Sequence, residues 1–235
     1  MTPRADPRGA PAPSLLLASA SPRRRRLLTL LGIPFDAVAT DLDERPLAGE
    51  PPDATARRLA AEKARRVAPP ADAWVLAADT VVVLDGRALG KPESLSEAAQ
   101  MLRALRDRWH AVVTAVALRP PAEAPARIGS VLSRVRMRPY SAAEIDASIA
   151  RGTPMDKAGA YAIQDERFRP VEALEGCYLN VVGLPLCEVA RLLRASGSEL
   201  PAPPAGDFQP PCAFCYAGAR LEGIGGAALL RAPTP

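Results

Sequence analysis

Short apolar runs alternate with amphipathic segments along residues 14–195, and this alternation limits the fold more than any other feature. Apolar, β-branched runs of about four to eight residues are typical of strands, whereas apolar positions three and four apart are typical of helices. A chain in which the two kinds of segment alternate folds with helices packed on a sheet. We therefore predict an α/β fold.

The predicted elements end well before the end of the chain. One domain is expected over residues 14–198, between a disordered extension at 1–13 and a Pro/Gly/Ala-rich tail at 199–235. Asp53 is expected to cap the second helix. The expected strands cover residues 14–18, 35–39, 74–84, 111–118, 128–137, 160–163 and 178–182, and the expected helices cover 22–31, 54–67, 96–106, 142–151 and 185–195.

The composition fits one enzyme-sized domain and disfavours two other classes of protein. With 235 residues, 48% of them hydrophobic, the chain can bury one sizeable core. Its 30 basic residues are interleaved with 26 acidic ones and only 4% of residues are aromatic, so a nucleic-acid-binding module is not favoured. The apolar run at residues 15–18 is too short for a signal peptide core of about 7–15 residues or a membrane span of about 18. We expect a cytoplasmic protein with no membrane or nucleic-acid partner.

Cysteine spacing gives a weak signal in the tail. Cys212 and Cys215 have C-x-x-C spacing, but a structural zinc site needs four ligands and the only histidine, His110, lies in another segment. We interpret the pair as incidental, or at most as a redox or metal feature of the tail.

The segment Ser19-Ala-Ser-Pro-Arg-Arg24 directly follows the first apolar run and indicates an anion-binding helix start. Ser21 is a favoured N-cap and Pro22 suits the first helical position, so Arg23 and Arg24 fall in the first turn. Backbone N–H groups and the helix dipole already attract anions there, and two guanidinium groups fit best if a phosphate binds. A solvated basic helix start is the alternative for this motif taken alone.

Two charged residues are expected in apolar surroundings. Lys63 lies four residues after Leu59 and four before Val67, on the apolar side of its helix, where an ammonium group needs a partner. Asp79 directly follows an apolar strand segment, near the rim of the sheet where α/β folds place ligand chemistry. Taken alone, Lys63 could extend to solvent and Asp79 could be a capping or turn residue.

Three carboxylates within four residues, Asp41, Asp43 and Glu44, suit a hard divalent cation held by oxygen ligands. For Asp41 and Asp43 a solvated acidic loop is the alternative. The D-x-D nucleophile motif of haloacid dehalogenase phosphatases fits poorly, because Glu44 and Arg45 follow the second aspartate.

Two glycine-containing segments are candidates for ligand binding. Gly86 to Lys91 looks like a phosphate loop, but it is one residue short between its glycines and has Pro92 where a serine or threonine should bind magnesium. We reject a P-loop. Gln164 follows a glycine-containing loop and is expected at a strand edge, where its amide could pair with a nucleobase edge, although structural use of such an amide is equally common.

Taken together and in order, these motifs resemble the Maf family of nucleoside triphosphate pyrophosphatases. The resemblance runs from about residue 14 to residue 195, and its joint order and spacing are specific although each motif is weak alone. It implies a mixed, elongated α/β structure with two lobes around a deep cleft, similar to inosine triphosphate pyrophosphatases, and members are often homodimers. The motifs are S-A-S-P-R-R, D-E, E-K-A, A-A-D-T-V-V, G-K-P, D-K-A-G-A-Y-A-I-Q and V-V-G-L-P-L.

Matched motif by motif, the resemblance implies that Asp79 is the general base and that Glu44 and Asp79 hold a divalent cation, Mg²⁺ or Mn²⁺. The A-D-T, S-P-R-R and A-I-Q segments look like the branch acting on dTTP and UTP. The 7-methyl-GTP branch tends to carry S-D-Q, a tryptophan after the first proline and a glutamate in place of Gln164. The implied substrate-binding residues are Ser21, Arg23, Arg24, Lys63, Thr80, Lys91 and Gln164.

The implied reaction is attack by water on the α-phosphorus of a nucleoside triphosphate, which releases a monophosphate and pyrophosphate. Such an enzyme could remove non-standard nucleotides and act in cell division arrest. The alternative is a nucleotide-sensing regulator of septum formation without significant turnover. Carboxylates at Glu44 and Asp79 beside the cations argue against that alternative, since a mere anion binder needs no negative charge near phosphates.

Overall fold

The computed structural model describes residues 14–68, 72–121, 124–198 and 200. The extension expected at residues 1–13 lies outside the described residues. So does the tail expected at 199–235, apart from residue 200, and with it Cys212 and Cys215.

In the described part of the chain, seven strands form one mixed sheet, which confirms the α/β class. The strand order is β2-β1-β3-β5-β6-β7, and β4 pairs with β3 outside this path. β1 runs parallel to β2 and β3, whereas the remaining pairs are antiparallel. The strands are β1 (Leu15–Ala18), β2 (Asp36–Val38), β3 (Trp74–Leu84), β4 (Arg87–Leu89), β5 (Trp109–Arg119), β6 (Arg127–Met137) and β7 (Val171–Glu175).

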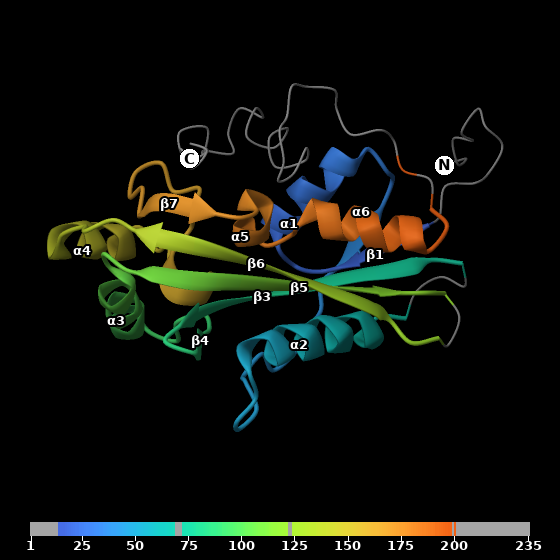
Figure 1. Cartoon of the computed structure of the whole chain (residues 1–235), viewed down its shortest axis with the longest axis horizontal. Coiled ribbons are helices and arrows are strands. Elements are labelled where there is room, and N and C mark those ends of the chain that lie inside the picture. Colours follow the sequence, from blue (N-terminus) through green and yellow to red (C-terminus); the bar gives the residue numbers. More distant parts are fainter. Residues whose placement is uncertain (1–13, 69–71, 122–123, 199, 201–235) are drawn as a thin grey trace.

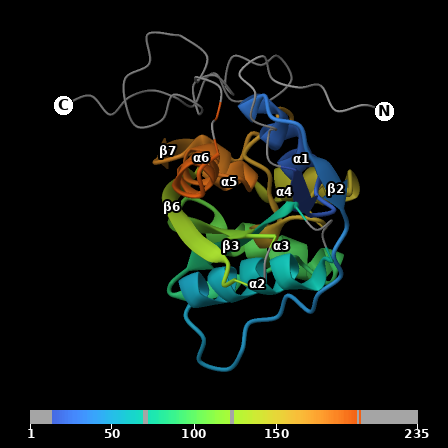
Figure 2. The same ribbon diagram turned by 90° about the vertical axis from the view of Figure 1, so that its right-hand side faces the viewer.

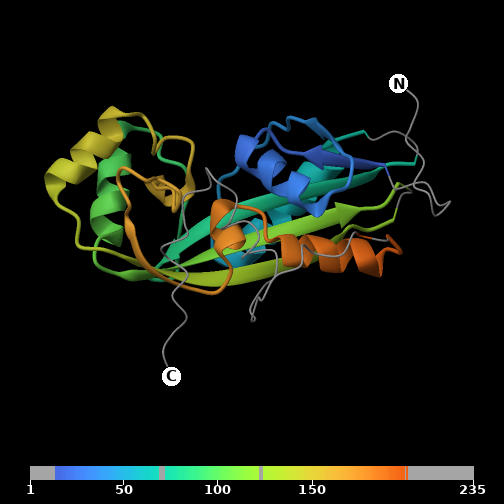
Figure 3. The same ribbon diagram turned by 90° about the horizontal axis from the view of Figure 1, so that it is seen from above.

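The helices cover both faces and one end of this sheet. Helix α2 packs on one face, and α1, α5 and α6 lie on the other (Figures 1 and 2). Helices α3 and α4 lie together at one end of the long strands, away from α1 and α6 (Figure 3). The helices are α1 (Pro22–Leu28), α2 (Pro52–Arg66), α3 (Leu95–Leu105), α4 (Ala142–Ala150), α5 (Tyr178–Val182) and α6 (Leu186–Ala195), with single 3₁₀ turns η1 (Thr29–Leu31) and η2 (Ala158–Ala160).

Helix α2 approaches the sheet closely because the contact is built from small residues. Ala56, Ala60 and Ala64 are fully buried against Ala77 of β3 and the alanines of β5. The C-terminal end of α2 is held by Arg119, whose guanidinium donates to the carbonyl oxygens of Ala64 and Val67. These contacts fix the position of Lys63 on the inward face of the helix.

The predicted cap of α2 is wrong. The N-cap position is Pro51, and Asp53 lies inside the first turn. The Asp53 carboxylate instead accepts hydrogen bonds from Arg57 and from Ser130 of β6, so it joins the helix to the sheet.

Two predicted strands have other structures. Residues 160–163 belong to η2 and the turn after it, because Gly159 and Ala160 adopt φ values of 68° and 60°, which end any extended run. Residues 178–182 form the short helix α5, since a brief apolar run is equally compatible with a buried helix. Strands β4 and β7 were not predicted. None of the helices in the described part of the chain combines the length and the apolar character that a membrane span requires.

Candidate active site

A cavity of about 830 Å³ opens between the α1 end of the molecule and the end that carries α3 and η2. Its walls come from the start of α1, the inward face of α2, the middle of β3, the segment after β4, and residues 155–164. The expected cleft between two lobes is therefore present. The predicted site residues Ser21, Arg23, Arg24, Glu44, Lys63, Asp79, Thr80, Lys91 and Gln164 all line this one cavity.

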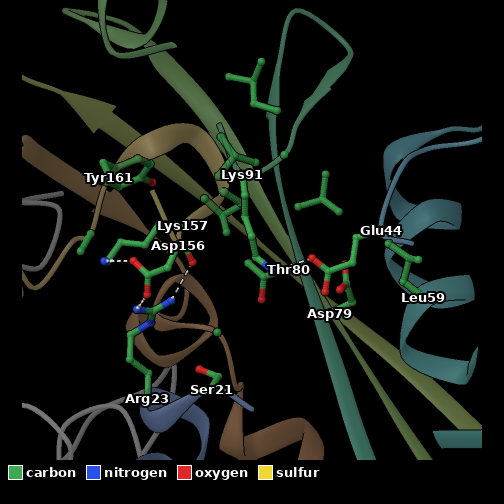
Figure 4. A pocket seen from close by; sticks show the side chains of 18 of the residues that line it. Ser21, Arg23, Glu44, Leu59, Asp79, Thr80, Lys91, Asp156, Lys157 and Tyr161 are labelled. Atoms are coloured by element: carbon green, nitrogen blue, oxygen red, sulfur yellow. Dashed lines mark hydrogen bonds and ion pairs between the residues drawn. The ribbon is translucent and has the colours of Figure 1, made fainter. Parts of the chain in front are cut away.

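The centre of the site is an alternating row of charges, of which Figure 4 labels Lys91, Glu44 and Asp79. Lys63 Nζ donates to Asp79 Oδ1 and to Glu44 Oε1, at 2.6 Å in both cases. Lys91 Nζ donates to the second oxygen of Glu44 at 2.5 Å. Lys63 and Asp79 are each only 5% exposed, so this pair lies in the protein interior at the base of the cleft. The sequence-based expectation that Lys63 points inward and needs a partner is confirmed.

The surroundings set the charges of the two carboxyl groups differently. Burial raises the pKa of Asp79 above its usual range, although Lys63 and Arg24 act to lower it. Burial also acts to raise the pKa of Glu44, but Lys63 and Lys91 outweigh it and lower that pKa to about 2. Glu44 is therefore a fixed negative charge, and Asp79 is the carboxyl group whose proton affinity has been increased.

Arg24 joins the start of α1 to the sheet. Its Nε donates to the carbonyl oxygen of Gly183 at 2.8 Å, and its Nη2 donates to Thr80 Oγ1 at 3.1 Å. Ser21 caps α1 as predicted, because its hydroxyl accepts a hydrogen bond from the backbone N–H of Arg24. Burial lowers the pKa of Arg24, and the Asp79 and Glu44 carboxylates act in the opposite direction.

Arg23 reaches across the cleft to the opposite wall. Its Nη1 lies 3.0 Å from Asp156 Oδ2, in the loop that precedes η2 (Figure 4). Gln164 lines the same wall, but it lies in a turn rather than at the edge of a strand as predicted. This ion pair therefore connects the two walls of the cleft through residues that are 133 positions apart in sequence.

Of the acidic cluster proposed for cation binding, only Glu44 reaches the cleft centre. Asp43 pairs with its exposed neighbour Arg45, and the backbone oxygen of Asp41 accepts a hydrogen bond from Arg66. Asp41 and Asp43 therefore fit the solvated-loop alternative.

Two cleft residues, Asp156 and Tyr161, and one residue behind the cleft, Thr114, were not predicted as site residues. Asp156 and Tyr161 fall inside the D-K-A-G-A-Y motif, whose glycine and polar residues are the signal that could have singled them out. Tyr161 is held by His110, whose Nε2 lies 2.7 Å from the tyrosine hydroxyl. Thr114 lies behind Thr80, and a lone threonine in the apolar run of β5 was the available signal.

The donor atoms fit a hard divalent cation, provided that a ligand supplies further oxygens. Within the described residues no group of three or more histidine, cysteine, aspartate or glutamate side chains is arranged to hold a metal ion. Glu44 and Asp79, however, already converge on one positive charge, the Lys63 ammonium. Mg²⁺ is commonly bound by one or two carboxylates together with substrate phosphates and water, and this pair offers that donor set.

A deep cleft that combines several cationic side chains with a buried carboxylate is typical of enzymes acting on phosphorylated substrates. The Maf-like protein family model matches residues 14–196. The chain belongs to the Maf family.

Individual relatives agree with this assignment. A protein from Thermomicrobium roseum named dTTP/UTP pyrophosphatase is 53% identical over 86% of this chain and 93% of its own length. A protein of the same name from Anaeromyxobacter dehalogenans is 50% identical over 81% of this chain and 97% of its own length. Among solved structures, the nucleoside-triphosphatase or dITP/XTP pyrophosphatase of Mycobacterium abscessus aligns over 78% of this chain and 97% of its own, with 16% identity and a TM-score of 0.39.

Proposed function

We propose that this protein hydrolyses dTTP and UTP to the nucleoside monophosphate and pyrophosphate. The observation that carries the proposal is the buried Asp79 carboxylate between Lys63 and Arg24 at the base of a cationic cleft. The names of the relatives that are 53% and 50% identical support the choice of nucleotides.

Asp79 is the general base in this proposal. It orients the attacking water and takes its proton as the water oxygen bonds to the α-phosphorus and the bond to the pyrophosphate leaving group breaks. A base works best when its pKa lies near the working pH, and burial moves the pKa of Asp79 in that direction. The Lys63 ammonium favours the ionised carboxylate before the reaction starts.

The cationic side chains bind and align the triphosphate. Lys63 pairs with Glu44 and Asp79, Lys91 pairs with Glu44, and both lysines line the cleft. Arg23 and the start of α1 extend the positive surface toward the wall that carries Gln164. Fixed cations that meet the negative charge of the transition state lower the barrier because they need no reorganisation during the reaction. Ser21 lines the cleft, and Thr80 and Gln164 are proposed to face the base.

We assign the cation site to Glu44 and Asp79, with Mg²⁺ or Mn²⁺ completed by phosphate oxygens and water. Such a cation, when bound, supplies charge neutralisation at the phosphates. Glu44 suits this role because its carboxylate stays ionised throughout the working pH range.

The test is pyrophosphate release from dTTP, UTP, CTP, dATP, GTP and 7-methyl-GTP with Mg²⁺ or Mn²⁺, for the wild type and Asp79→Asn. We expect activity with dTTP and UTP, and a loss of at least 10³-fold in kcat for the variant with nucleotide binding retained. Asp43→Asn is the matched control, because it removes an exposed carboxylate near the cleft and should leave activity unchanged. Full activity of Asp79→Asn would refute the general-base role, and hydrolysis of 7-methyl-GTP would refute the nucleotide assignment.

Binding of dTTP or UTP without any turnover would instead favour a nucleotide-sensing regulator. We further propose that the enzyme acts in the cytoplasm, where its substrates are made, and that it is a homodimer, as is common in the family. Light scattering coupled to size exclusion measures the oligomeric state directly, and a monomeric mass would refute the dimer.

A further inference from the structure

Two hydrogen-bonded hydroxyl groups lead from the cleft into the protein interior through Thr80. Thr80 of β3 and Thr114 of β5 are direct cross-strand partners, and their Oγ1 atoms lie 2.9 Å apart. The Thr114 hydroxyl also lies 2.9 Å from the backbone oxygen of Asn180 in α5. Thr114 is fully buried, whereas Thr80 lines the cleft (Figure 4).

The direction of each of these hydrogen bonds follows from the one group that can only accept. The backbone oxygen of Asn180 has no proton, so Thr114 must donate its single hydroxyl proton to it. Thr114 is then left as an acceptor, and Thr80 must donate its own proton to Thr114. Arg24 Nη2, which can only donate, completes the arrangement by donating to Thr80. The Thr80 hydroxyl therefore has no proton left for a ligand and one lone pair that is free to accept.

We propose that Thr114 is a positioning residue that makes Thr80 a pure hydrogen-bond acceptor in the cleft, so that the site selects a pyrimidine whose ring N3 carries a proton. This inference rests on the proposed function, in which Thr80 faces the base. Uracil and thymine carry a proton on N3, whereas neutral cytosine presents a lone pair there. Two facing lone pairs repel each other, and each loses its hydrogen bond to water.

The same hydrogen-bond pattern explains why a threonine alone could not provide this selection. A freely rotating hydroxyl donates or accepts as required, so it would bind either pyrimidine. Selection requires that the Thr80 hydroxyl proton be held in a hydrogen bond inside the protein. Thr114 on the neighbouring strand accepts that hydrogen bond. Specificity of this kind depends on rejecting the wrong ligand as much as on binding the right one.

The test compares UTP with CTP in the wild type, Thr114→Val and Thr114→Ser. Valine has the shape of threonine without the hydroxyl, so the Thr80 proton can turn toward the cleft. We expect the ratio of kcat/KM for CTP to that for UTP to rise about tenfold in Thr114→Val, the size of one hydrogen bond. Thr114→Ser keeps the hydroxyl and should keep the wild-type ratio. The Asn180 oxygen still accepts from the backbone N–H of Gly183 at 3.0 Å, which limits the damage to the fold.

A second pair of variants separates positioning from a merely structural role. In a Thr80→Val background no hydroxyl remains to be oriented, so adding Thr114→Val should leave the ratio unchanged. An equal loss for both nucleotides in Thr114→Val, or a raised ratio in Thr114→Ser, would overturn the inference.

Affinities for UTP and CTP, measured by calorimetry, distinguish this inference from the proposed function. If the wild type binds both nucleotides but hydrolyses neither, the proposed function fails, and the affinity ratio in Thr114→Val still tests the role of Thr114. If the wild type binds neither nucleotide, both proposals are wrong.

Discussion

The Nζ atom of Lys63 lies 2.6 Å from Oδ1 of Asp79, and both side chains are almost fully buried. Burying two charges costs several kcal/mol each, and the attraction between them offsets that cost only when both partners are present. The pair is therefore retained for function rather than for stability. The effects of substituting its two members on the free energy of unfolding should be strongly coupled.

We expect Lys63→Met and Asp79→Asn each to lower the free energy of unfolding by about 2–4 kcal/mol. Lys63→Met leaves the buried Asp79 carboxyl group without its ammonium partner, and Asp79→Asn leaves the buried Lys63 ammonium with Glu44 alone. The double variant should lose less than the sum of the two single losses, by about 2 kcal/mol or more. Urea unfolding of the four proteins measures this coupling. Additive losses would show that Lys63 and Asp79 do not interact in solution as they do here.

The exposed pair formed by Arg45 and Asp43 is the matched control, since its nitrogen and oxygen atoms are also 2.6 Å apart. Solvent screens this pair, and the same cycle with Arg45→Met and Asp43→Asn should give a far smaller coupling than the buried pair. The comparison separates the effect of burial from the effect of distance.

Release of Arg23 from Asp156 should improve substrate binding. The ion pair occupies the Arg23 guanidinium in the free protein, so a nucleotide must displace Asp156 before Arg23 can bind it. Asp156→Asn should lower KM for dTTP severalfold with little change in kcat. Steady-state kinetics of the wild type and the variant provide the measurement.

Glu93→Gln removes the same charge from the cleft wall without touching Arg23, and it is the control for this experiment. A similar fall in KM in both variants would mean that the effect is a general change of potential in the cleft. A rise in KM in Asp156→Asn would mean that Asp156 itself contacts the substrate.

The sequence predicts the charged centre of the site because its residues stand in patterned elements. Lys63 falls on the apolar side of a periodic helix, and Asp79 directly follows the apolar start of a long strand. Ser21 and Pro22 mark a helix start by local chemistry alone. Each of these signals depends on neighbours within a few residues, which is the range over which sequence patterns carry structural information.

The contacts that the sequence does not predict are long-range or depend on backbone conformation. The partnership of Thr80 with Thr114 depends on the register of β3 and β5, which no local pattern fixes. The segment that carries Gln164 was predicted as a strand, because the positive φ of Ala160 cannot be read from an alanine. The Arg23 to Asp156 contact requires the whole fold to bring the two walls together.

The stability of the fold should fall in mild acid because of His110. This side chain is 5% exposed, and burial lowers its pKa to about 4 from an ordinary value of 6.5. The unfolded chain therefore binds a proton at a higher pH than the folded one, so stability is complete above about pH 6.5 and is lost as the pH falls toward 4. The loss attributable to His110 is about 3 kcal/mol.

Urea unfolding between pH 7 and pH 4 measures this loss, and His110→Gln should flatten the profile relative to the wild type. Carboxyl groups titrate in the same pH range as His110, so only the difference between the wild-type and His110→Gln profiles isolates the contribution of His110. Tyr161→Phe removes the hydrogen bond to His110 but keeps the imidazole, and the pH dependence should persist in that variant. An unchanged slope in His110→Gln would contradict the assignment.

Gly159 couples the loop of Gln164 to the centre of the sheet. Its backbone N–H donates to the carbonyl oxygen of Gly90 at 3.0 Å, next to Lys91, and its φ of 68° favours glycine. A Cβ atom at this position would lie 3.0 Å from Cγ1 of Val82 in β3. Gly159→Ala should therefore cost about 2–3 kcal/mol of stability, from backbone strain and overpacking together, and should lower kcat/KM by displacing the loop and Lys91.

Two further variants divide that cost into its parts. Gly86 has a φ of 76° but nothing within 4 Å of its Cβ position, so Gly86→Ala should cost only the backbone strain, about 1 kcal/mol, and leave activity intact. Val82→Ala makes room for the new methyl group, so adding it to Gly159→Ala should recover part of the lost activity. Thermal unfolding and pyrophosphate release on the same preparations test both. If Gly159→Ala were as harmless to activity as Gly86→Ala, the loop would not control the position of Lys91, because of these two substitutions only Gly159→Ala places a Cβ atom against β3.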